Sequence, residues 1–581
     1  MKIFWKLLLI AVVILSLTAG WQWWNRPHRV DMADYVPADS IIYIEANSLP
    51  EVINGITSTD AWRALAPQAG IKTDFNKISK LSKFASWTGI GSADAVVLAR
   101  AQVAITVLDF DATEETATTL KIMPRAALVA ETHTGEERAR AAVEKLVGDF
   151  ARRVYGSPRI ERRETNGITF SEWTAPTDPR RKIIATVSGS VAVIGNDSVA
   201  VEACLAAQRG ERPTLMNNPQ LGQMRGRISA SDALAFGFLP SGSTAKLLEI
   251  AVLPYVAQAS SNPRAQSVAA SLLPQLANKI FDNAGWSAHV SNGKIEDRYF
   301  LALRNGLASR LSAAVVASDQ LTRPASKLLP ADTFQMSQYN YREPEIAWRG
   351  LNAAISSQLD ALSAPFVTIL LDEALRPYGI ETPREFLRAA GPDMATARLD
   401  DAGSSTILIV GVRDREALRQ QIRKRLGGGV QTTRIGDAEM LSTAKSERGV
   451  AAFVDEHLIL GRAESVRRCL DARASGNTLA TTTNFMQAIS LAAADPPTGV
   501  VTFSDDRESV RKFISYFAGT QETRAKSVGD EALEQAIGQH ANATTMTGLT
   551  KDGFARRTYS SFGQFGNLVT QFAPGGTSQE D

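Results

Sequence analysis

A five-residue segment occurs twice in this chain of 581 residues, as Val36-Pro37-Ala38-Asp39-Ser40 and as Leu329-Pro330-Ala331-Asp332-Thr333. Proline fixes φ, and an aspartate side chain accepts hydrogen bonds from nearby backbone N–H groups, so both copies favour a turn. A strand is predicted directly after each copy, at 40–45 and at 334–340. We therefore expect each copy to bend the chain into the first strand of a structural unit.

Other matches follow the two copies in the same order. Gly70-Ile71 corresponds to Gly379-Ile380, each ahead of a predicted helix, and Val193-Ile194-Gly195 corresponds to Ile459-Leu460-Gly461 at the end of a predicted strand. Colinear matches of this kind indicate an internal repeat. The length of the chain also exceeds what a single hydrophobic core can serve. The sequence thus predicts two homologous modules.

The fold class expected for each module is α+β. Predicted strands are separated by hairpin-type turns and by helices without a regular βαβ period, which favours a mostly antiparallel sheet with helices packed on it. An N-terminal transmembrane helix is expected to precede the modules. The predicted parts are a cytoplasmic start and anchor (1–24), a stalk (25–35), a first repeat (36–308), a linker (309–328), a second repeat (329–565) and a disordered tail (566–581).

The two repeats are expected to differ in two places. An arginine-rich insertion at 151–181 has only the tight Leu426-Gly427-Gly428-Gly429 opposite it in the second repeat. An alanine-rich helical pair at 243–283 corresponds to a more charged pair at 505–540. Within the first repeat, Ala93–Ala101 is predicted to be β-rich.

The N-terminal segment carries the prediction of cellular location. An apolar run from Leu7 to Leu15 lies within residues 3–24, which as a helix would rise roughly 30 Å, enough to cross a bilayer. Lys2 and Lys6 favour a cytoplasmic N-terminus, and Trp residues follow the run as they do at membrane interfaces. We expect a single-pass protein of the cell membrane, anchored through 3–24, whose body lies outside the cytoplasm, in the periplasm or the exterior. A cleaved signal peptide is the alternative.

Charge and cysteine content exclude several classes of protein. With 63 basic and 61 acidic side chains the formal charge is +2, so no nucleic-acid partner is expected. Two cysteines, Cys204 and Cys469, are too few for a disulfide framework or a thiolate zinc cage. Both are expected to be buried.

No catalytic, cofactor-binding or metal-binding residue can be assigned from motifs. The S-x-x-K pattern occurs at Ser243/Lys246 and at Ser442/Lys445, but without the S-D-N and K-T-G elements that accompany it in serine hydrolases. The five histidines are scattered and form no metal-binding pattern. No enzyme activity and no cofactor are therefore expected.

The arginine-rich insertion contains the only candidate contact residues. Guanidinium groups bind phosphate and carboxylate well, and several of them on one loop could contact an anionic surface. Nearby acidic residues weaken this field, and a solvated hairpin face is the simpler interpretation. The candidate residues are Arg152, Arg153, Arg159, Arg162 and Arg163.

The Pro-Ala-Asp segments give the chain a resemblance to a known family. It resembles a bacterial membrane-anchored family catalogued only as a domain of unknown function, with Leu-Pro-Ala-Asp-Thr-type openings that lead into a strand. A Gly-Ile step and a later glycine continue that pattern, here Gly70-Ile71 and Gly379-Ile380. The first copy departs from it at Val36 and Ser40. The resemblance implies no catalytic residue.

These features together predict a membrane-anchored, extracytoplasmic protein that binds or scaffolds an envelope protein or polymer. Two alternatives stay open. One is an envelope hydrolase with a site between the two modules, and the other is a sensor or chaperone-like partner of secreted proteins.

Overall fold

The structure is a computed structural model of the whole chain. It describes residues 27–71, 75–116, 119–165, 167–247, 274–304, 306–317, 324–357, 375, 378, 380, 382–444, 449–493, 499–518 and 529–572. The helical pair predicted at 243–283 falls largely outside these residues.

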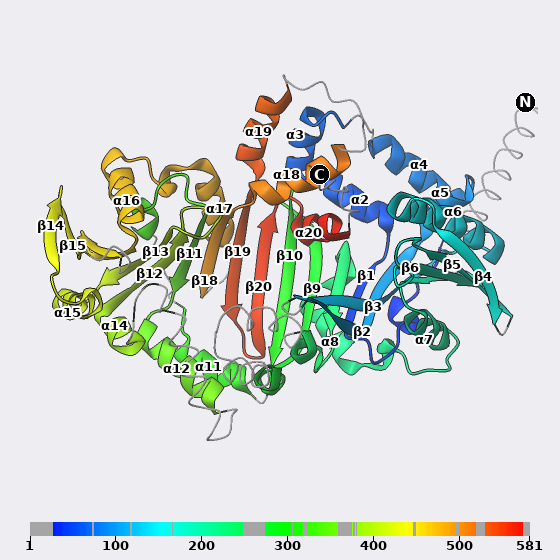
Figure 1. Cartoon of the computed structure of the whole chain (residues 1–581), viewed down its shortest axis with the longest axis horizontal. Helices are drawn as coiled ribbons and strands as arrows, with labels where there is room; N and C mark the ends of the chain where they lie inside the picture. Colours follow the sequence, from blue (N-terminus) through cyan, green and yellow to red (C-terminus); the bar gives the residue numbers. More distant parts are fainter. Residues whose placement is uncertain are drawn as a thin grey trace, which may run out of the picture.

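The described strands form one antiparallel sheet that crosses the whole molecule (Figure 1). The first half of the chain contributes β1 (Ile42–Ala46), β2 (Gln102–Thr116), β3 (Thr119–Glu131), β4 (Arg159–Thr165), β5 (Ile168–Thr174), β6 (Lys182–Ser188), β7 (Val191–Gly195), β8 (Ala235–Leu239), β9 (Phe281–Ser291) and β10 (Lys294–Leu303). Their order in space is β4-β5-β6-β7-β3-β2-β1-β8-β9-β10.

The second half contributes strands in the same spatial order. They are β11 (Gln335–Asn340), β12 (Ala390–Arg398), β13 (Thr406–Val412), β14 (Gln431–Ile435), β15 (Ala438–Ser442), β16 (Val450–Val454), β17 (His457–Gly461), β18 (Val500–Asp505), β19 (Asn542–Leu549) and β20 (Gly553–Ser560). They run β14-β15-β16-β17-β13-β12-β11-β18-β19-β20. The predicted mostly antiparallel α+β architecture is confirmed.

The two halves meet where β10 pairs with β20. In this pairing Arg298 lies directly opposite Arg557. Like charges opposite each other destabilise a sheet, but Glu296 hydrogen-bonds to Arg298 at 2.8 and 3.0 Å and lies 4.0 Å from Arg557. Burial alone would raise the pKa of Glu296, and the two guanidinium groups lower it overall. This carboxylate thus offsets the repulsion between the two arginines.

Helices cover the sheet and reach across the junction between the halves. Those of the first half are α2 (Leu49–Thr57), α3 (Asp60–Gln68), α4 (Phe75–Thr88), α5 (Ala93–Arg100), α6 (Glu136–Tyr155), α7 (Ser198–Gln208), α8 (Pro219–Arg227) and α11 (Leu307–Ala314). Those of the second are α12 (Pro344–Ser356), α14 (Pro383–Ala389), α15 (Arg415–Leu426), α16 (Ala463–Ser475), α17 (Thr483–Ala493), α18 (Arg507–Ala518), α19 (Gly529–His540) and α20 (Gly563–Phe572). Residues 309–314 and 566–572, predicted to be linker and tail, are therefore helical.

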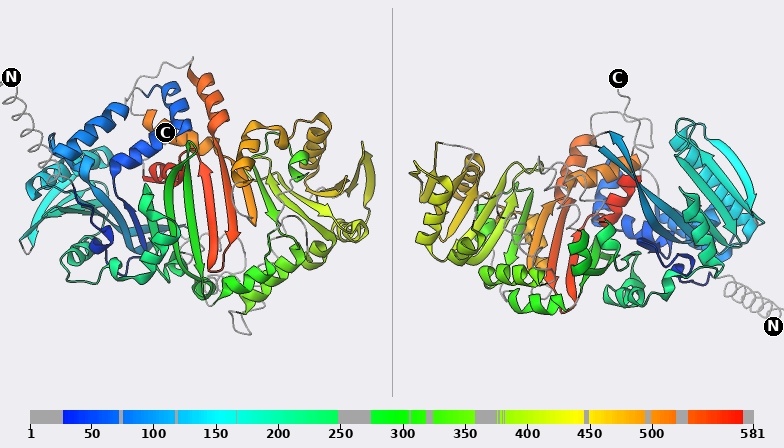
Figure 2. Two further views of the ribbon diagram at one scale, coloured as in Figure 1. Left: turned by 180° about the vertical axis from the view of Figure 1, so that it is seen from behind. Right: turned by 60° about the horizontal axis from the view of Figure 1, so that its bottom comes forward.

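Two apolar clusters join the halves. Trp62 of α3 packs edge-on against Phe513 and Phe517 of α18, beside α19, at the top of the view in Figure 1. Phe565 of α20 packs edge-on against Trp286 of β9, with ring centroids 5.9 Å apart. Figure 2 shows the same crossing of segments from behind and from below. Each half thus supplies part of the other's core.

The two repeated segments make matching contacts. Pro37 forms an isolated bridge with Thr214, and Pro330 forms one with Thr478. The hydroxyl of Ser40 donates to the carbonyl of Pro37 at 2.7 Å, as the hydroxyl of Thr333 does to Pro330 at 2.6 Å. An arginine pairs with the aspartate of each copy, Arg212 with Asp39 and Arg468 with Asp332. The segments therefore act as turns ahead of β1 and β11.

Two local predictions are wrong. Residues 93–100 form helix α5 rather than a strand, with Asp94 in the first turn, Arg100 in the last and Val96 and Val97 buried. The second half also crosses the region opposite the arginine-rich insertion with a β-hairpin, β14–β15, after the glycines at 427–429. A short apolar run does not by itself distinguish helix from strand.

The prediction of a membrane span is also corrected. Among the described residues no helix is both long and apolar enough to cross a membrane. The longest of them, α6, has 20 residues but carries charges throughout, from Glu136 to Arg153. Residues 3–24, on which the single-pass location rested, lie outside the described part of the chain.

Candidate functional site

A polar cavity of about 200 Å³ lies at the junction of the two halves. Its floor is formed by the strands β10, β18, β19 and β20, and its rim by the first turns of α18 and α20. It is thus built from segments far apart in the sequence, on the face of the sheet that carries Asp297 and Tyr299.

Asp297 is the most buried acid in this cavity, with 2% of its surface exposed. Its Oδ1 accepts a hydrogen bond from the indole N–H of Trp286 at 2.8 Å, and its Oδ2 accepts one from the backbone N–H of Gln564 at 2.9 Å. Burial raises the pKa of Asp297 to about 6, although both hydrogen bonds oppose this shift. A first-half carboxyl therefore caps a second-half helix, α20.

Gly563 allows this close approach. Its φ is +60°, and a Cβ at this position would lie 2.4 Å from Ile295 Cγ2 and 2.8 Å from Asp297 Oδ2. Only glycine fits a backbone conformation and contact of this kind without strain. The start of α20 is thereby held against β10.

Asp506 is the second acid in the cavity and directly precedes α18. Burial raises its pKa to about 6, and a hydrogen bond from Ser509 opposes the shift. Lys294 is close enough for its charge to act on Asp506. The ammonium of Lys294 donates to Asn542 Oδ1 at 2.6 Å, and burial lowers its pKa to about 8.

The rest of the lining is composed mainly of hydroxyl and amide groups. Thr545 and Thr558 hydrogen-bond to each other at 3.0 Å across β19 and β20. The guanidinium of Arg556 lies 5.7 Å from the ring centre of Tyr299, and burial raises the pKa of this tyrosine. Ser504, Ser560, Gln564 and Asn567 complete the polar wall. Such a lining provides many donors and acceptors and little net charge.

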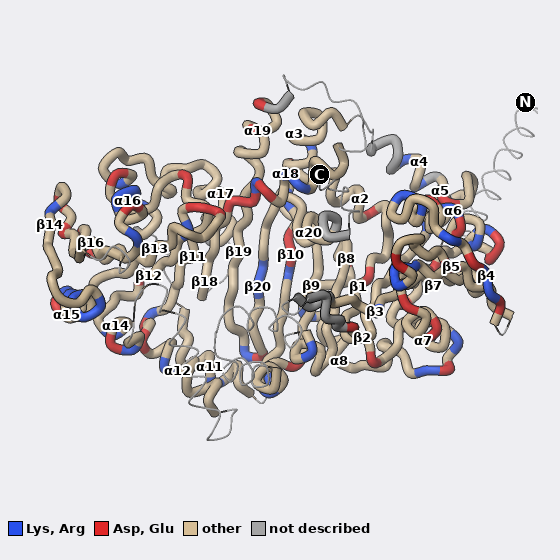
Figure 3. The backbone as a smooth tube through the Cα atoms, in the orientation of Figure 1, with Lys and Arg blue, Asp and Glu red and all other residues tan. Residues whose placement is uncertain are grey.

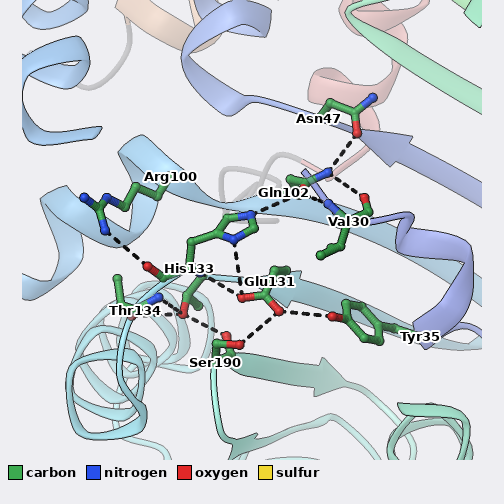
Figure 4. A network of polar contacts seen from close by, with 10 residues as sticks. Val30, Tyr35, Asn47, Arg100, Gln102, Glu131, His133, Thr134 and Ser190 are labelled. Carbon is green, nitrogen blue, oxygen red and sulfur yellow. Dashed lines mark hydrogen bonds and ion pairs between the residues drawn. The ribbon is translucent and has the colours of Figure 1, made fainter. Parts of the chain in front are cut away.

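A second polar network lies in the first half (Figure 4). Its polar groups hydrogen-bond to one another. The carboxylate of Glu131 accepts hydrogen bonds from Tyr35 and Ser190 and from the backbone N–H of His133. His133 Nε2 is 3.0 Å from Gln102 Oε1, and Gln102 also binds both backbone groups of Val30. Burial lowers the pKa of His133. This network fastens the segment before β1 to the sheet.

The five arginines predicted to contact an anionic surface lie on α6 and on the edge strand β4, at the right-hand end of Figure 3. Four of them form ion pairs within the chain: Arg152 with Asp149, Arg159 with Glu161, Arg162 with Glu144 and Arg163 with Glu202. All seven residues of β4 are exposed. Charged edge strands resist pairing with other chains, which gives this strand a protective role.

The other groups considered from sequence stay apart from the cavity. Asp39 and Asp332 form surface ion pairs in different halves. Cys204 and Cys469 are buried and free, and burial raises the pKa of each thiol to about 12. Among the described residues no group of three or more His, Cys, Asp or Glu side chains could hold a metal ion.

Asp297 and Asp506 were not predicted from sequence. Asp506 did carry a local signal, because an acid between a strand and a helix is typical of an N-cap. Asp297 carried a weaker one, an acid within a predicted strand. The two are 209 positions apart in the chain, and only the β10–β20 pairing brings them to one cavity.

Comparisons with known proteins provide little context for this cavity. No protein-family model matches the chain, and no curated protein matches it. A solved structure, crystal form III of TP0453, aligns with a TM-score of 0.24 at 10% identity, over 51% of this chain and 90% of that chain. A TM-score this low does not indicate a shared fold.

Proposed function

We propose that this protein works by binding, and that it holds a small hydroxyl-rich ligand in the central cavity without transforming it. The observation that carries the proposal is the lining of the cavity. Hydroxyls, amides, a tyrosine and two carboxyl groups face one space of about 200 Å³. Binding sites place a few convergent polar groups to fix a ligand's orientation.

The raised pKa values of the two acids favour a neutral, hydrogen-bonding ligand. Near pH 6 Asp297 and Asp506 are each about half protonated, so the cavity carries less negative charge than its composition suggests. A carboxyl group in either state accepts hydrogen bonds from ligand hydroxyls. The volume suits a molecule of about monosaccharide size.

We also infer that the two halves derive from one duplicated unit. The shared strand order, the matched bridges at Pro37 and Pro330, and the matched ion pairs at Asp39 and Asp332 support this inference. A cavity at the junction would then be a product of the duplication, because neither half alone supplies its walls.

A hydrolase with a site between the halves is the second candidate. Two carboxyl groups whose pKa values are raised to about 6 are suited to acid and base roles. Asp297 is already engaged by Trp286 and Gln564, however, and serves as a helix cap. This engagement favours the binding role.

The test is a screen of monosaccharide-sized polyols by ligand-observed NMR, followed by titration. The double variant Thr545→Val/Thr558→Val removes two cavity hydroxyls and keeps their shape. We expect its affinity for a bound polyol to fall at least tenfold. The matched control is Ser337→Ala/Thr502→Val, which removes a hydroxyl pair on β11 and β18 outside the cavity lining.

Equal affinity in both double variants would contradict the cavity as the site. Product formation from a bound polyol derivative, lost in Asp506→Asn, would replace binding by the hydrolase function.

A further inference from the structure

A small pocket in the second half contains a half-buried guanidinium, one nitrogen of which is buried and has no hydrogen-bond partner among the described residues. The pocket lies between α14 and α15, and Thr382, Phe386, Gln421, Ile422, Lys424 and Arg425 line it. Its volume of about 20 Å³ holds a group of about the size of one water molecule.

The unusual member of this pocket is Arg425, in the last turn of α15. Its Nη1 atom is buried and has no hydrogen-bond partner in the part of the chain that the structure describes. Its guanidinium packs against the backbone at Gly449, where an added Cβ would lie 3.1 Å from Nη2. Burial lowers the pKa of Arg425, and no carboxylate of the described residues opposes this shift.

Neighbouring arginines of the same helix bind a carboxylate. Arg419 hydrogen-bonds to Glu439 at 2.8 and 3.0 Å, although its Nε is also buried without a partner among the described residues. Arg415 binds the same carboxylate at 3.2 Å. Arg425 differs from both because no described carboxylate binds it, and a buried N–H without a partner costs about 1–3 kcal/mol in general.

The surroundings of Arg425 are basic and partly apolar. Lys424 adds a second cation at the pocket. Gln421, which also lines the pocket, donates a hydrogen bond to Glu385 at 2.8 Å. Figure 3 shows α15 as a predominantly blue segment at the left-hand end of the molecule. On the apolar side, Phe386 and Ile422 provide a wall.

We propose that this pocket binds the oxyanion end of a ligand, a carboxylate or phosphate group, through Arg425 and Lys424. The guanidinium fork matches the geometry of both groups. Only one oxygen of the oxyanion enters, because the pocket has room for about one water-sized group. The rest of the ligand lies outside the pocket mouth. This site is separate from the central cavity and does not depend on the function proposed there.

The test compares inorganic phosphate, acetate and chloride at constant ionic strength, by thermal unfolding and by calorimetric titration of the full chain. We expect phosphate or acetate to raise the Tm of the wild type and chloride to have no effect. The anion that binds more tightly identifies the ligand group.

Three variants make the test specific. Arg425→Met keeps the apolar stem and should weaken anion binding at least tenfold, while the anion-free Tm stays equal or rises because the unpaired charge is gone. Lys424→Met, at an exposed position, should weaken anion binding about threefold. It tests the same pocket if Arg425→Met fails to fold. Arg423→Met, exposed on the same helix, should bind anions as the wild type does.

Anion stabilisation that is equal in the wild type and in Arg425→Met would overturn the proposal. So would the absence of any difference between phosphate, acetate and chloride in the wild type.

Discussion

The two halves of the molecule share a strand order but stabilise its first strand differently. In the first half Glu45 of β1 binds Arg225 and the hydroxyl of Tyr43, in a buried cluster that includes Asp31. In the second half Gln338 holds the same offset from the repeated segment and donates to Asp393 at 2.7 Å. Strand pairing is therefore kept while the buried polar residues are exchanged.

The replacement of Glu45 by Gln338 shows that the sheet requires a hydrogen-bonded polar side chain at this position, and not a charged one. Asp393 also contacts His457 Nε2 at 2.8 Å, so the second half uses an amide and an imidazole where the first uses a guanidinium and two carboxylates. Either set satisfies most of its polar atoms, as buried polar groups must be. The charged set is the more fragile, because loss of one member leaves an uncompensated charge.

The largest effect is expected for Arg225→Met. Removing this guanidinium leaves the buried Glu45 and the partly buried Asp31 without their cation, at a cost of about 3–5 kcal/mol in the free energy of unfolding. Urea unfolding followed by circular dichroism measures it. Arg227→Met, on the same helix but in an exposed pair with Asp552, should cost less than about 1 kcal/mol. An equal loss of unfolding free energy in the two variants would show that the buried ion pairs of Arg225 contribute no more than the exposed ion pair of Arg227.

The next effect concerns the junction. Gly563→Ala should destabilise the protein by about 3 kcal/mol, because it combines a left-handed backbone with a clash against Ile295. Trp286 fluorescence should report the change. The control is Gly538→Ala in α19, where the added methyl meets open space and should be neutral or slightly stabilising. A neutral Gly563→Ala would show that α20 does not lock the halves.

A pH effect should come from the cavity acids. Because burial raises the pKa of Asp297 to about 6 in the folded protein, its contribution favours folding at low pH and is lost as pH rises from about 4 to 6. In Asp297→Asn this loss, ~2–3 kcal/mol, should disappear. Unfolding free energies at pH 4, 5, 6 and 7 measure it. If the free energy of unfolding of Asp297→Asn changed with pH as that of the wild type does, the titrating group would be a residue other than Asp297.

The smallest effects should be equal in the two halves. Asp39→Ala and Asp332→Ala each remove a surface ion pair from one repeated segment, and each should cost less than about 1 kcal/mol. Differential scanning calorimetry of both variants measures the difference between them. A much larger loss from one would show that the two segments are not equivalent.

The antiparallel sheet could be predicted from sequence because local signals mark its strands and turns. Pro37 and Pro330 open matched strands, and turns and caps recur at matched offsets. Helix α5 was mispredicted because its apolar residues, such as Val96 and Val97, are compatible with either a helix or a strand.

The cavity and the anion pocket could not be predicted in the same way. Asp297 meets the start of α20 only through the pairing of β10 with β20, in which it lies opposite Thr558, 261 positions later in the chain. The isolation of Arg425 is a property of what surrounds it, and its sequence neighbours, Lys424 and Leu426, give no sign of it. Such sites depend on long-range register, which no local pattern encodes.

The crossing of α20 onto β9 and β10 has a consequence for how the chain is made. A ribosome completes Trp286 about 280 residues before Phe565, which covers it, and at 5–20 residues per second this takes roughly 15–55 s. During that interval the first half exposes an apolar surface that only the later half can cover. Newly made first halves should therefore engage chaperones, and premature termination should yield an aggregating product rather than a working fragment.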